Sequence, residues 1–344
     1  MKLQFKFLIL GFFVALVSCD SDDDAVILPL GDYENGVLIL NEGSQDFGSV
    51  TFLSDDFNEV EQEIFSTVNP NDNLGNFVQS IFFDNNDRAY IIANGSNLIT
   101  VVNRYTFEKV GEFVTGLDIP RYGVVVDGKA YVTNQASFAT SDDDFVAVID
   151  IDSLSLQTII PIMNTVETII YDGSRLYIQN AAFGFGSGVT IVNPNSNSVE
   201  ETVSTGDGLQ DIAINVNSIY ALHATGVDII STNTQEVTST INMPSDLSGA
   251  TNLRIFNGEL YYTAQTSVYK SPITASTLSN NAFITYESNS AFGAMYGFAV
   301  REGLVYIGDA TDFASNGFIE VYDTNGNFVY ETSVGVGPNG FYFN

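Results

Sequence analysis

The sequence has few of the side chains from which most metal and nucleophilic centres are built. Its 344 residues include one histidine, His223, one cysteine, Cys19, and no tryptophan. A tetrahedral zinc site, a multi-histidine copper site and a Cys–His nucleophile pair each need more His or Cys than this. Without tryptophan, a quinone cofactor also has no indole ring on which to stack. The composition therefore predicts binding or carboxylate chemistry, with no cofactor and no metal centre.

Basic residues are scarce as well. The chain has 11 Lys and Arg against 42 Asp and Glu, which gives a formal net charge of −31. Nucleic-acid affinity depends on neutralising phosphates with Lys and Arg, so nucleic acid is not an expected partner. Because 45% of the residues are apolar, the chain can bury a large core and is too apolar to be disordered.

The N-terminus has the features of an export signal. Two lysines precede an apolar run over residues 7–17, which is too short to span a bilayer as a helix but suits a secretory signal. The run ends in Leu16-Val17-Ser18-Cys19, which resembles a bacterial lipobox. We expect residues 1–18 to be a signal peptide and Cys19 to be lipidated. The alternative is an ordinary signal peptide with a chance cysteine.

An acidic run follows the cysteine directly. Residues 20–24 read Asp-Ser-Asp-Asp-Asp, which resembles the export signal that sends lipoproteins of Bacteroidota to the cell surface. The alternative is a solvated linker, since blocks of like charge are usually that. In both interpretations residues 19–35 form an acidic tether, and the membrane is reached through the lipid alone.

An internal repeat fills the rest of the chain. A strand ending in the pattern Tyr-apolar-x-Asn/His recurs, with adjacent tyrosines 41 to 46 residues apart. The repeated tyrosines are Tyr90, Tyr131, Tyr177, Tyr220, Tyr261 and Tyr306. A seventh copy without tyrosine covers residues 37–41. Periods of this length are typical of propeller blades.

Each repeat also contains the signals of a four-stranded antiparallel sheet. An apolar strand and a tight turn such as Asp127-Gly128 precede each tyrosine strand, and a third and a fourth strand follow it. The sequence therefore predicts an all-β fold, a seven-bladed β-propeller over residues 36–344. A last strand at residues 340–344 has no hairpin partner, so we expect it to close the ring by joining the first blade.

This repeat resembles the YncE-like, surface-layer type of seven-bladed β-propeller. Together with the lipobox and the acidic run it is similar to surface lipoproteins of Bacteroidota, some of which sit over the TonB-dependent corrinoid transporter and capture vitamin B12. The resemblance implies a lipid-anchored binding module on the outer membrane that takes up a corrinoid for that transporter. The alternatives are a protein-interaction or adhesion scaffold and, with less support, a lactonase-like hydrolase.

Candidate ligand-binding residues come first from the innermost strands. Aligning these strands places one polar side chain from each repeat at the mouth of the central channel. These are Gln79, Tyr122, Glu167, Gln210, Asn252, Tyr296 and Asn339. A ring rich in amides suits a ligand with many amides and hydroxyls. Arg121 lies beside the ring and could pair with Glu167 or receive a ligand phosphate.

The loops after the tyrosine strands supply the second set of candidates. They carry Glu42, Gln45, Phe47, Gln135, Phe138, Phe183, Phe185, His223, Gln265, Asp309 and Phe313. The phenylalanines form either an exposed aromatic rim or local core beneath their own loops. We expect His223 to be a hydrogen-bonding residue rather than a cobalt ligand. A hydrolase would use Glu167 or Asp309 as its base.

Two acidic loops could in principle hold calcium. They are residues 141–144 (Ser-Asp-Asp-Asp) and residues 309–312 (Asp-Ala-Thr-Asp). Neither has the spacing of an EF-hand loop or its distant glutamate. We expect both to be solvated loops without a metal.

Overall fold

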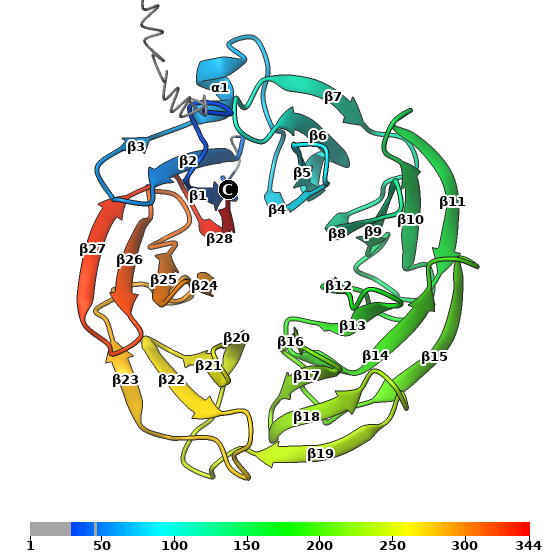
Figure 1. Cartoon of the computed structure of the whole chain (residues 1–344), viewed down its shortest axis with the longest axis vertical. Coiled ribbons are helices and arrows are strands. Elements are labelled where there is room, and N and C mark those ends of the chain that lie inside the picture. Colours follow the sequence, from blue (N-terminus) through cyan, green and yellow to red (C-terminus); the bar gives the residue numbers. More distant parts are fainter. Residues whose placement is uncertain (1–28, 45–46) are drawn as a thin grey trace, which may run out of the picture.

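The computed structural model describes residues 29–44 and 47–344. These residues form seven four-stranded antiparallel sheets arranged as blades around a central axis (Figure 1). The predicted all-β, seven-bladed propeller is therefore confirmed. The proposed signal peptide, the lipobox with Cys19, the acidic run and Gln45 lie outside the described residues.

The blades follow one another around the ring in chain order, and the first strand of each lies at the central channel. Blade 1 contains β28 (Pro338–Phe343), β1 (Gly36–Asn41), β2 (Ser49–Ser54) and β3 (Val60–Glu61). Blade 2 contains β4 (Val78–Phe83), β5 (Arg88–Ala93), β6 (Leu98–Asn103) and β7 (Lys109–Phe113). Blade 3 contains β8 (Pro120–Val126), β9 (Lys129–Asn134), β10 (Phe145–Asp150) and β11 (Ser155–Pro161). Blade 4 contains β12 (Ile169–Tyr171), β13 (Leu176–Ala182), β14 (Phe185–Asn193) and β15 (Ser198–Ser204).

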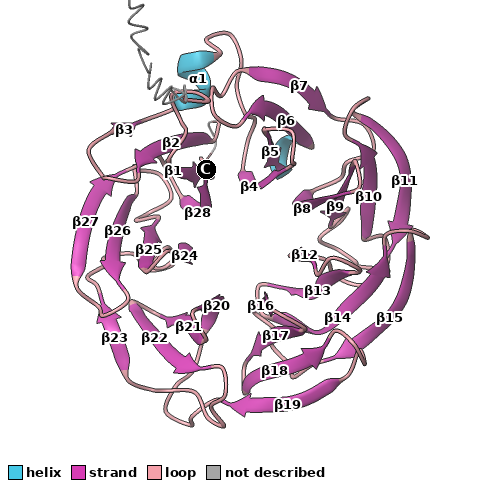
Figure 2. Ribbon diagram, viewed as in Figure 1, coloured by secondary structure: helices cyan, strands magenta, loops and turns pink. Residues whose placement is uncertain are grey.

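The last three blades have the same plan. Blade 5 contains β16 (Asp211–Asn215), β17 (Ser218–His223), β18 (Gly226–Ser231) and β19 (Val237–Asn242). Blade 6 contains β20 (Thr251–Phe256), β21 (Glu259–Ala264), β22 (Ser267–Pro272) and β23 (Ala282–Thr285). Blade 7 contains β24 (Gly297–Arg301), β25 (Leu304–Asp309), β26 (Phe318–Asp323) and β27 (Phe328–Ser333). Figure 2 shows how little helix accompanies these strands, namely α1 (Ile64–Val68) and η1 (Asn94–Ser96). In the part of the chain that the structure describes, no helix has the length and apolar character needed to cross a membrane.

The hydrophobic core lies between neighbouring blades. One cluster joins Leu38 and Leu40 of blade 1 to Ile81 and Ile91 of blade 2, and similar clusters continue around the ring. The repeated tyrosines of the second strands are part of this core. All are nearly fully buried, and the hydroxyl of Tyr90 donates a hydrogen bond to a carboxylate in the turn between the first two strands of its own blade. This explains why the tyrosine recurs with the repeat.

The C-terminal strand closes the ring, as predicted. Strand β28 pairs antiparallel with β1, with Leu38 opposite Tyr342 and Ile39 opposite Phe341. The guanidinium of Arg104 in blade 2 donates to the backbone oxygen of Phe343 at 2.9 Å. Blade 1 thus combines the C-terminal strand β28 with the N-terminal strands β1 to β3, and a hydrogen bond from blade 2 helps to hold β28 in place.

The two faces of the ring are built differently. One face, called the loop face, carries the connections between the second and third strands and those that lead into the next blade. The other, called the turn face, carries the tight turns between the first two and the last two strands. The segment 29–35 lies on the turn face, where the Tyr33 N–H bonds the Tyr105 oxygen at 2.9 Å and the Asn35 oxygen accepts from Asp55 N–H at 3.1 Å.

Candidate functional site

The polar residues predicted at the channel mouth do come from equivalent places in the blades, and several bond one another. The Gln79 amide nitrogen donates to the Tyr122 hydroxyl at 3.1 Å, and its amide oxygen accepts from Asn94 at 3.0 Å. The first bond connects blades 2 and 3, and the second fixes the Gln79 side chain within blade 2. Part of the predicted amide ring therefore holds the channel together rather than presenting free amides.

A buried ion pair belongs to this ring. Arg121 donates to Glu167 at 2.6 Å from Nη2 and at 3.1 Å from Nε, and the two side chains are about 9% and 12% exposed. Gln135 adds a donor to the same carboxylate at 2.8 Å. Burial raises the pKa of Glu167, and the charge of Arg121 works against that rise. Of the two roles expected for Arg121, the structure shows the structural salt bridge.

The remaining ring residues also have partners within the protein. The amide nitrogen of Asn252 donates to the Met295 oxygen at 3.1 Å, and that of Asn339 donates to the Val78 oxygen at 2.9 Å. The Tyr296 hydroxyl donates to Glu42, and burial raises the pKa of both groups. Each of these bonds joins one blade to the next, so this part of the ring is rigid.

Gln210 links the ring to a hairpin above it. A Cβ placed on Gly184, at the tip of the β13–β14 hairpin, would lie 2.3 Å from the Gln210 amide nitrogen. The glycine therefore allows the hairpin tip to rest directly on the Gln210 side chain. This contact positions the two phenylalanines that flank the glycine.

His223 and Asp309 lie beneath the surface. His223 is 2% exposed, its Nδ1 accepts from the Thr225 N–H at 3.3 Å, and its Nε2 is 3.4 Å from Asp228. Asp309 is 1% exposed and accepts the hydroxyl of Tyr286 at 2.6 Å. Both side chains are thus held by hydrogen bonds or a charge partner within the protein, at the ends of strands β17 and β25. Across residues 29–44 and 47–344 there is no group of three or more His, Cys, Asp or Glu that could hold a metal ion.

The phenylalanines of the loop face are exposed. Phe138, Phe183 and Phe185 are 74%, 79% and 81% exposed, which answers the question of rim or local core that the sequence left open. Phe47 is also largely exposed, whereas Phe313 packs edge to face against Tyr296. Strand β14 begins at Phe185, directly beside the tip of its hairpin. A two-residue turn at residues 183–184 lets the hairpin extend that far.

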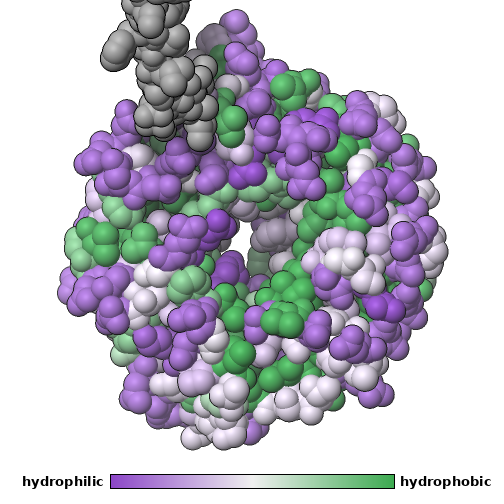
Figure 3. Space-filling model, viewed as in Figure 1, coloured by the Kyte–Doolittle hydropathy of each residue, from purple (hydrophilic) through white to green (hydrophobic). Residues whose placement is uncertain are grey.

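Sequence reasoning missed three further apolar side chains on the same face. Phe77, Met163 and Phe292 lie in the segments that lead into the next blade, and all three are exposed. The sequence prediction covered the loops after the tyrosine strands, and these three residues lie outside those loops. Together with Phe47, Phe138, Phe183 and Phe185 they make up what we call the aromatic face. Figure 3 shows hydrophobic side chains beside the central opening on the side of the ring in view, while most of the outer surface is polar.

Several residues of the aromatic face have an unusual backbone conformation. Phe77, Met163 and Phe183 have φ values of 52°, 56° and 53°. Residues other than Gly, Asn and Asp rarely adopt this left-handed backbone conformation, because the Cβ then crowds the following carbonyl oxygen. Residues held at such a local cost cluster at functional sites. Left-handed positions also occur in turns of the opposite face, for example at Phe57 and Val216, so it is the gathering of exposed Phe and Met side chains that distinguishes the aromatic face.

The fold and its two faces define a β-propeller whose architecture suits a binding or scaffold module. Residues 35–343 match the family described as Domain of unknown function (DUF5074), and the chain belongs to this family. No curated protein matches the sequence.

Solved structures show the same fold at low sequence identity. A quinonprotein alcohol dehydrogenase-like protein from Bacteroides thetaiotaomicron VPI-5482 has a TM-score of 0.66 and 15% identity, and the match covers 90% of this chain and 78% of that chain. A functionally unknown protein from Desulfotomaculum acetoxidans DSM 771 has a TM-score of 0.65 and 12% identity, with 90% and 98% covered. Hydrazine synthase from Kuenenia stuttgartiensis has a TM-score of 0.56 and 16% identity, with 76% and 87% covered. At such low sequence identity, the similarity shows the fold but not the function.

Proposed function

We propose that this propeller is a binding module that captures a large amphipathic ligand on its aromatic face, with a corrinoid as the first candidate. The observation that carries the proposal is the group of exposed phenylalanines on one face, some of them in a disfavoured backbone conformation. Exposed apolar groups that gather on one face of a soluble domain mark interaction sites. In this proposal the captured ligand passes to a TonB-dependent outer-membrane transporter.

The chemistry of a corrinoid suits this face in two respects. Its ring is a broad disc that can lie on aromatic side chains such as Phe183 and Phe185, which stand together on the β13–β14 hairpin. Its peripheral amides need polar partners, and the loops of this face carry hydroxyl side chains beside the aromatic rings, for example Ser137 and Thr140 in the pocket that Phe138 lines. The pockets of this face are shallow for such a ligand, about 260 Å³ beside Phe138 and about 440 Å³ beside Phe47. The disc would therefore lie on the rim and not inside the channel.

A protein partner is the second candidate. Shallow pockets and exposed aromatics are also what a protein interface offers, because interface cores are enriched in Phe and Met. The hydrolase alternative has less support. The candidate base Glu167 already binds Arg121 and Gln135, and the carboxylate of Asp309 accepts three donors.

Titration calorimetry of residues 25–344 with cyanocobalamin tests the first candidate. We expect saturable binding that weakens at least tenfold in the double variant Phe183→Ala/Phe185→Ala, since buried aromatic anchors typically contribute about 2 kcal/mol or more. Phe328→Ala is the matched control, because Phe328 is also exposed but lies on the outer strand β27. It should bind like the parent. Absence of corrinoid binding by the parent would contradict the proposal and favour the protein partner.

Surface display is a separate part of the proposal. The lipobox-like sequence at residues 16–19 supports lipid attachment at Cys19, and the acidic run at residues 20–24 supports export to the cell surface. In membrane fractionation, Cys19→Ala should shift the protein to the soluble fraction. Unchanged membrane retention of this variant would contradict lipid anchoring.

A further inference from the structure

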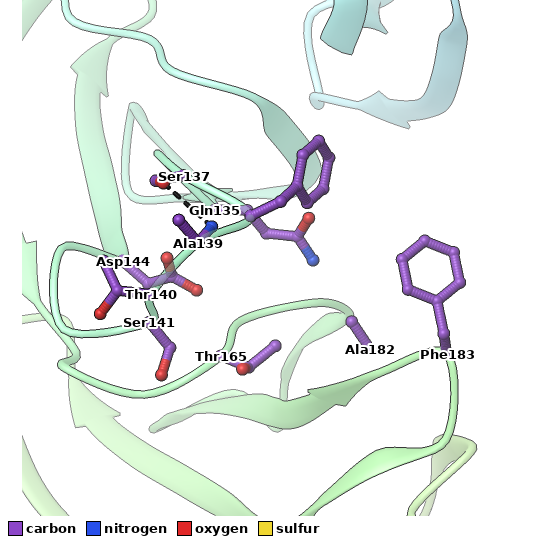
Figure 4. Close-up of a pocket in the computed structure, with 10 residues that line it drawn as sticks. Gln135, Ser137, Ala139, Thr140, Ser141, Asp144, Thr165, Ala182 and Phe183 are labelled. Carbon is purple, nitrogen blue, oxygen red and sulfur yellow. Dashed lines mark hydrogen bonds between the residues drawn. The ribbon is translucent and has the colours of Figure 1, made fainter.

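A small pocket lies on the loop face between blades 3 and 4. It has a volume of about 260 Å³, and its walls come from the loop between β9 and β10, from Thr165 and from the tip of the β13–β14 hairpin. Figure 4 shows Thr140, Ser141 and Asp144 at one end of this pocket and Phe183 at the other. The pocket is thus polar at one end and apolar at the other.

Two buried oxygen atoms in this pocket lack hydrogen-bond donors. Asp144 is 2% exposed, its Oδ2 accepts from the Val166 N–H at 3.1 Å, and its Oδ1 has no partner among the described residues. Gln135 is 3% exposed, and its amide nitrogen donates to the Val166 oxygen at 3.1 Å and to Glu167 at 2.8 Å. Its Oε1 also lacks a donor within the part of the chain that is described. Buried acceptors without donors are rare in folded proteins, so this pair needs an explanation.

A partner for these two oxygens must supply hydrogen-bond donors. The carboxylate of Asp144 and the amide of Gln135 belong to the lining of one pocket, and a negative charge there favours a cation. Calcium takes six to eight oxygen ligands, and no acidic cluster of that kind occurs in residues 29–44 and 47–344. The other end of the pocket is lined by Phe138 and Phe183. These rings give an apolar surface to the aliphatic stem of an organic cation, but they have no oxygen ligand for calcium.

We propose that this pocket binds a primary ammonium group on an aliphatic stem, as in an alkylamine or a lysine side chain. The ammonium group donates to Asp144 Oδ1 and Gln135 Oε1, and the stem runs outward past Phe138 and Phe183. An ammonium group has three donors and no acceptor, which matches two unpaired oxygens beside the hydroxyls of Thr140 and Ser141. The net charge of −31 adds a general attraction for cations.

The charge state of Asp144 supports the same ligand. Burial raises the pKa of Asp144 to about 7, the hydrogen bond from Val166 lowers it, and the charges of Asp143 on the same loop and Glu167 on blade 4 raise it further. Glu167 itself is paired with Arg121. A bound ammonium group stabilises the ionised carboxylate, so binding should weaken as the pH falls below 7 and Asp144 takes up a proton.

The test is titration calorimetry at pH 8 on the full chain in mild detergent. The probes are n-pentylammonium chloride, Nα-acetyl-lysine methylamide, the neutral analogue Nα-acetyl-norleucine methylamide and calcium chloride. We expect at least one of the two ammonium probes to bind and the neutral analogue and calcium not to. Tighter binding of pentylammonium identifies a small amine as the source of the group, and tighter binding of the lysine derivative identifies a protein side chain.

Two matched variants assign the binding to this pocket. Asp144→Asn keeps the shape and the acceptor for Val166 but removes the charge, and it should weaken ammonium binding at least tenfold. Asp143→Asn changes an exposed neighbour on the same loop, and it should bind within about twofold of the parent. The proposal is overturned by equal binding of the norleucine analogue, by saturable calcium binding, by unchanged affinity in Asp144→Asn, or by no ammonium binding at all. None of these results depends on corrinoid binding, so this site and the proposed function are tested separately.

Discussion

The turn face and the loop face of the ring both carry aspartates, but these aspartates differ in their hydrogen bonding and in their pKa. On the turn face carboxylates are saturated with donors: Asp323 accepts from the backbone of Asn325 and Asn327, and bonds from the Asn327 side chain and backbone lower its pKa to about 2. On the loop face Asp144 is buried with one oxygen that has no donor among the described residues, and burial raises its pKa.

Both faces hold large side chains in the left-handed backbone region, for example Phe57 and Val216 in turns of the turn face. On the turn face, the left-handed position at Asp127 is followed by Gly128, a pair that tight hairpin turns prefer. On the loop face, Phe77 and Phe183 occupy left-handed positions with their rings exposed. The comparison teaches that buried, hydrogen-bonded carboxylates of the turn face stabilise the fold, whereas Asp144 and the hairpin tip of the loop face lower its stability. Removing a buried acceptor on the turn face should therefore destabilise the protein, and changes at Asp144 and Phe183 should leave it folded or stabilise it.

The largest effect should come from removing the closing strand. Deletion of residues 338–344 takes β28 out of blade 1 and leaves β1 with an open edge beside the channel. The loss of buried Phe341 and its neighbours should cost on the order of 5 kcal/mol of unfolding free energy or cause aggregation. Urea denaturation followed by circular dichroism measures this. A truncated chain as stable as the parent would show that the strand pairing is not needed for closure.

A single carboxylate on the turn face should have the next largest effect. Asp84 is 7% exposed and accepts from Arg88 Nε at 2.6 Å and from the Tyr90 hydroxyl at 3.0 Å. Asp84→Ala takes the acceptor away from Arg88 Nε and leaves the hydroxyl of the buried Tyr90 without its partner, and it should cost about 3 kcal/mol in urea denaturation. The control is Asp152→Ala, since Asp152 is exposed and reaches Arg88 only at 3.6 Å. It should cost less than about 1 kcal/mol, and equal losses would refute the assignment.

On the loop face, the effect of Asp144 should depend on pH. Its pKa in the folded protein is about 7, above the ordinary value of 3.8, so the folded state binds the proton more tightly than the unfolded state. The stability that this provides is present below about pH 4, is lost as the pH rises to about 7, and stays lost above that. Asp144→Asn should therefore raise the melting temperature at pH 8 by several degrees and by little at pH 4. A gain that is the same at both values would contradict the raised pKa.

The smallest expected effect is a gain in stability at the hairpin tip. Residues 183 and 184 both have positive φ, and Phe183→Asn creates the Asn-Gly pair that such two-residue turns prefer. We expect thermal unfolding to show a gain of about 0.5 to 1 kcal/mol, together with weaker ligand capture. Phe185→Asn is the control, because Phe185 is equally exposed but lies on the strand β14. It should weaken ligand capture without stabilising the fold. A loss of stability in Phe183→Asn would contradict the statement that Phe183 has an unfavourable backbone conformation.

The fold could be predicted from the sequence because its signals are local and repeated. The tyrosine strands and turns such as Asp127-Gly128 recur around the ring with little variation. The closing strand was predicted because it is the strand that has no hairpin partner. The inner ring was predicted by aligning the entries of the innermost strands, because its members lie at the start of these strands or just before them. The salt bridge between Arg121 and Glu167 was among the alternatives for the same reason.

The ammonium pocket could not be predicted in this way. Asp144 ends a run of polar residues that is typical of a solvated loop, and its burial depends on Val166 of the next blade. The left-handed backbone conformation at Phe77, Met163 and Phe183 could not be predicted either, because Gly usually occupies such positions and Phe and Met do not. Contacts between blades, and not local pattern, decide both features.

The position of the segment 29–35 has a practical consequence for measurements on immobilised protein. Its backbone binds the turns at Asp55 and Tyr105, and the Asn344 side chain donates to the Tyr33 oxygen at 2.7 Å, so both described ends of the chain lie on the turn face. A tag or lipid joined at either end would hold a sensor surface or a vesicle against that side. The aromatic face would then point into solution, accessible to analytes without competition from the support.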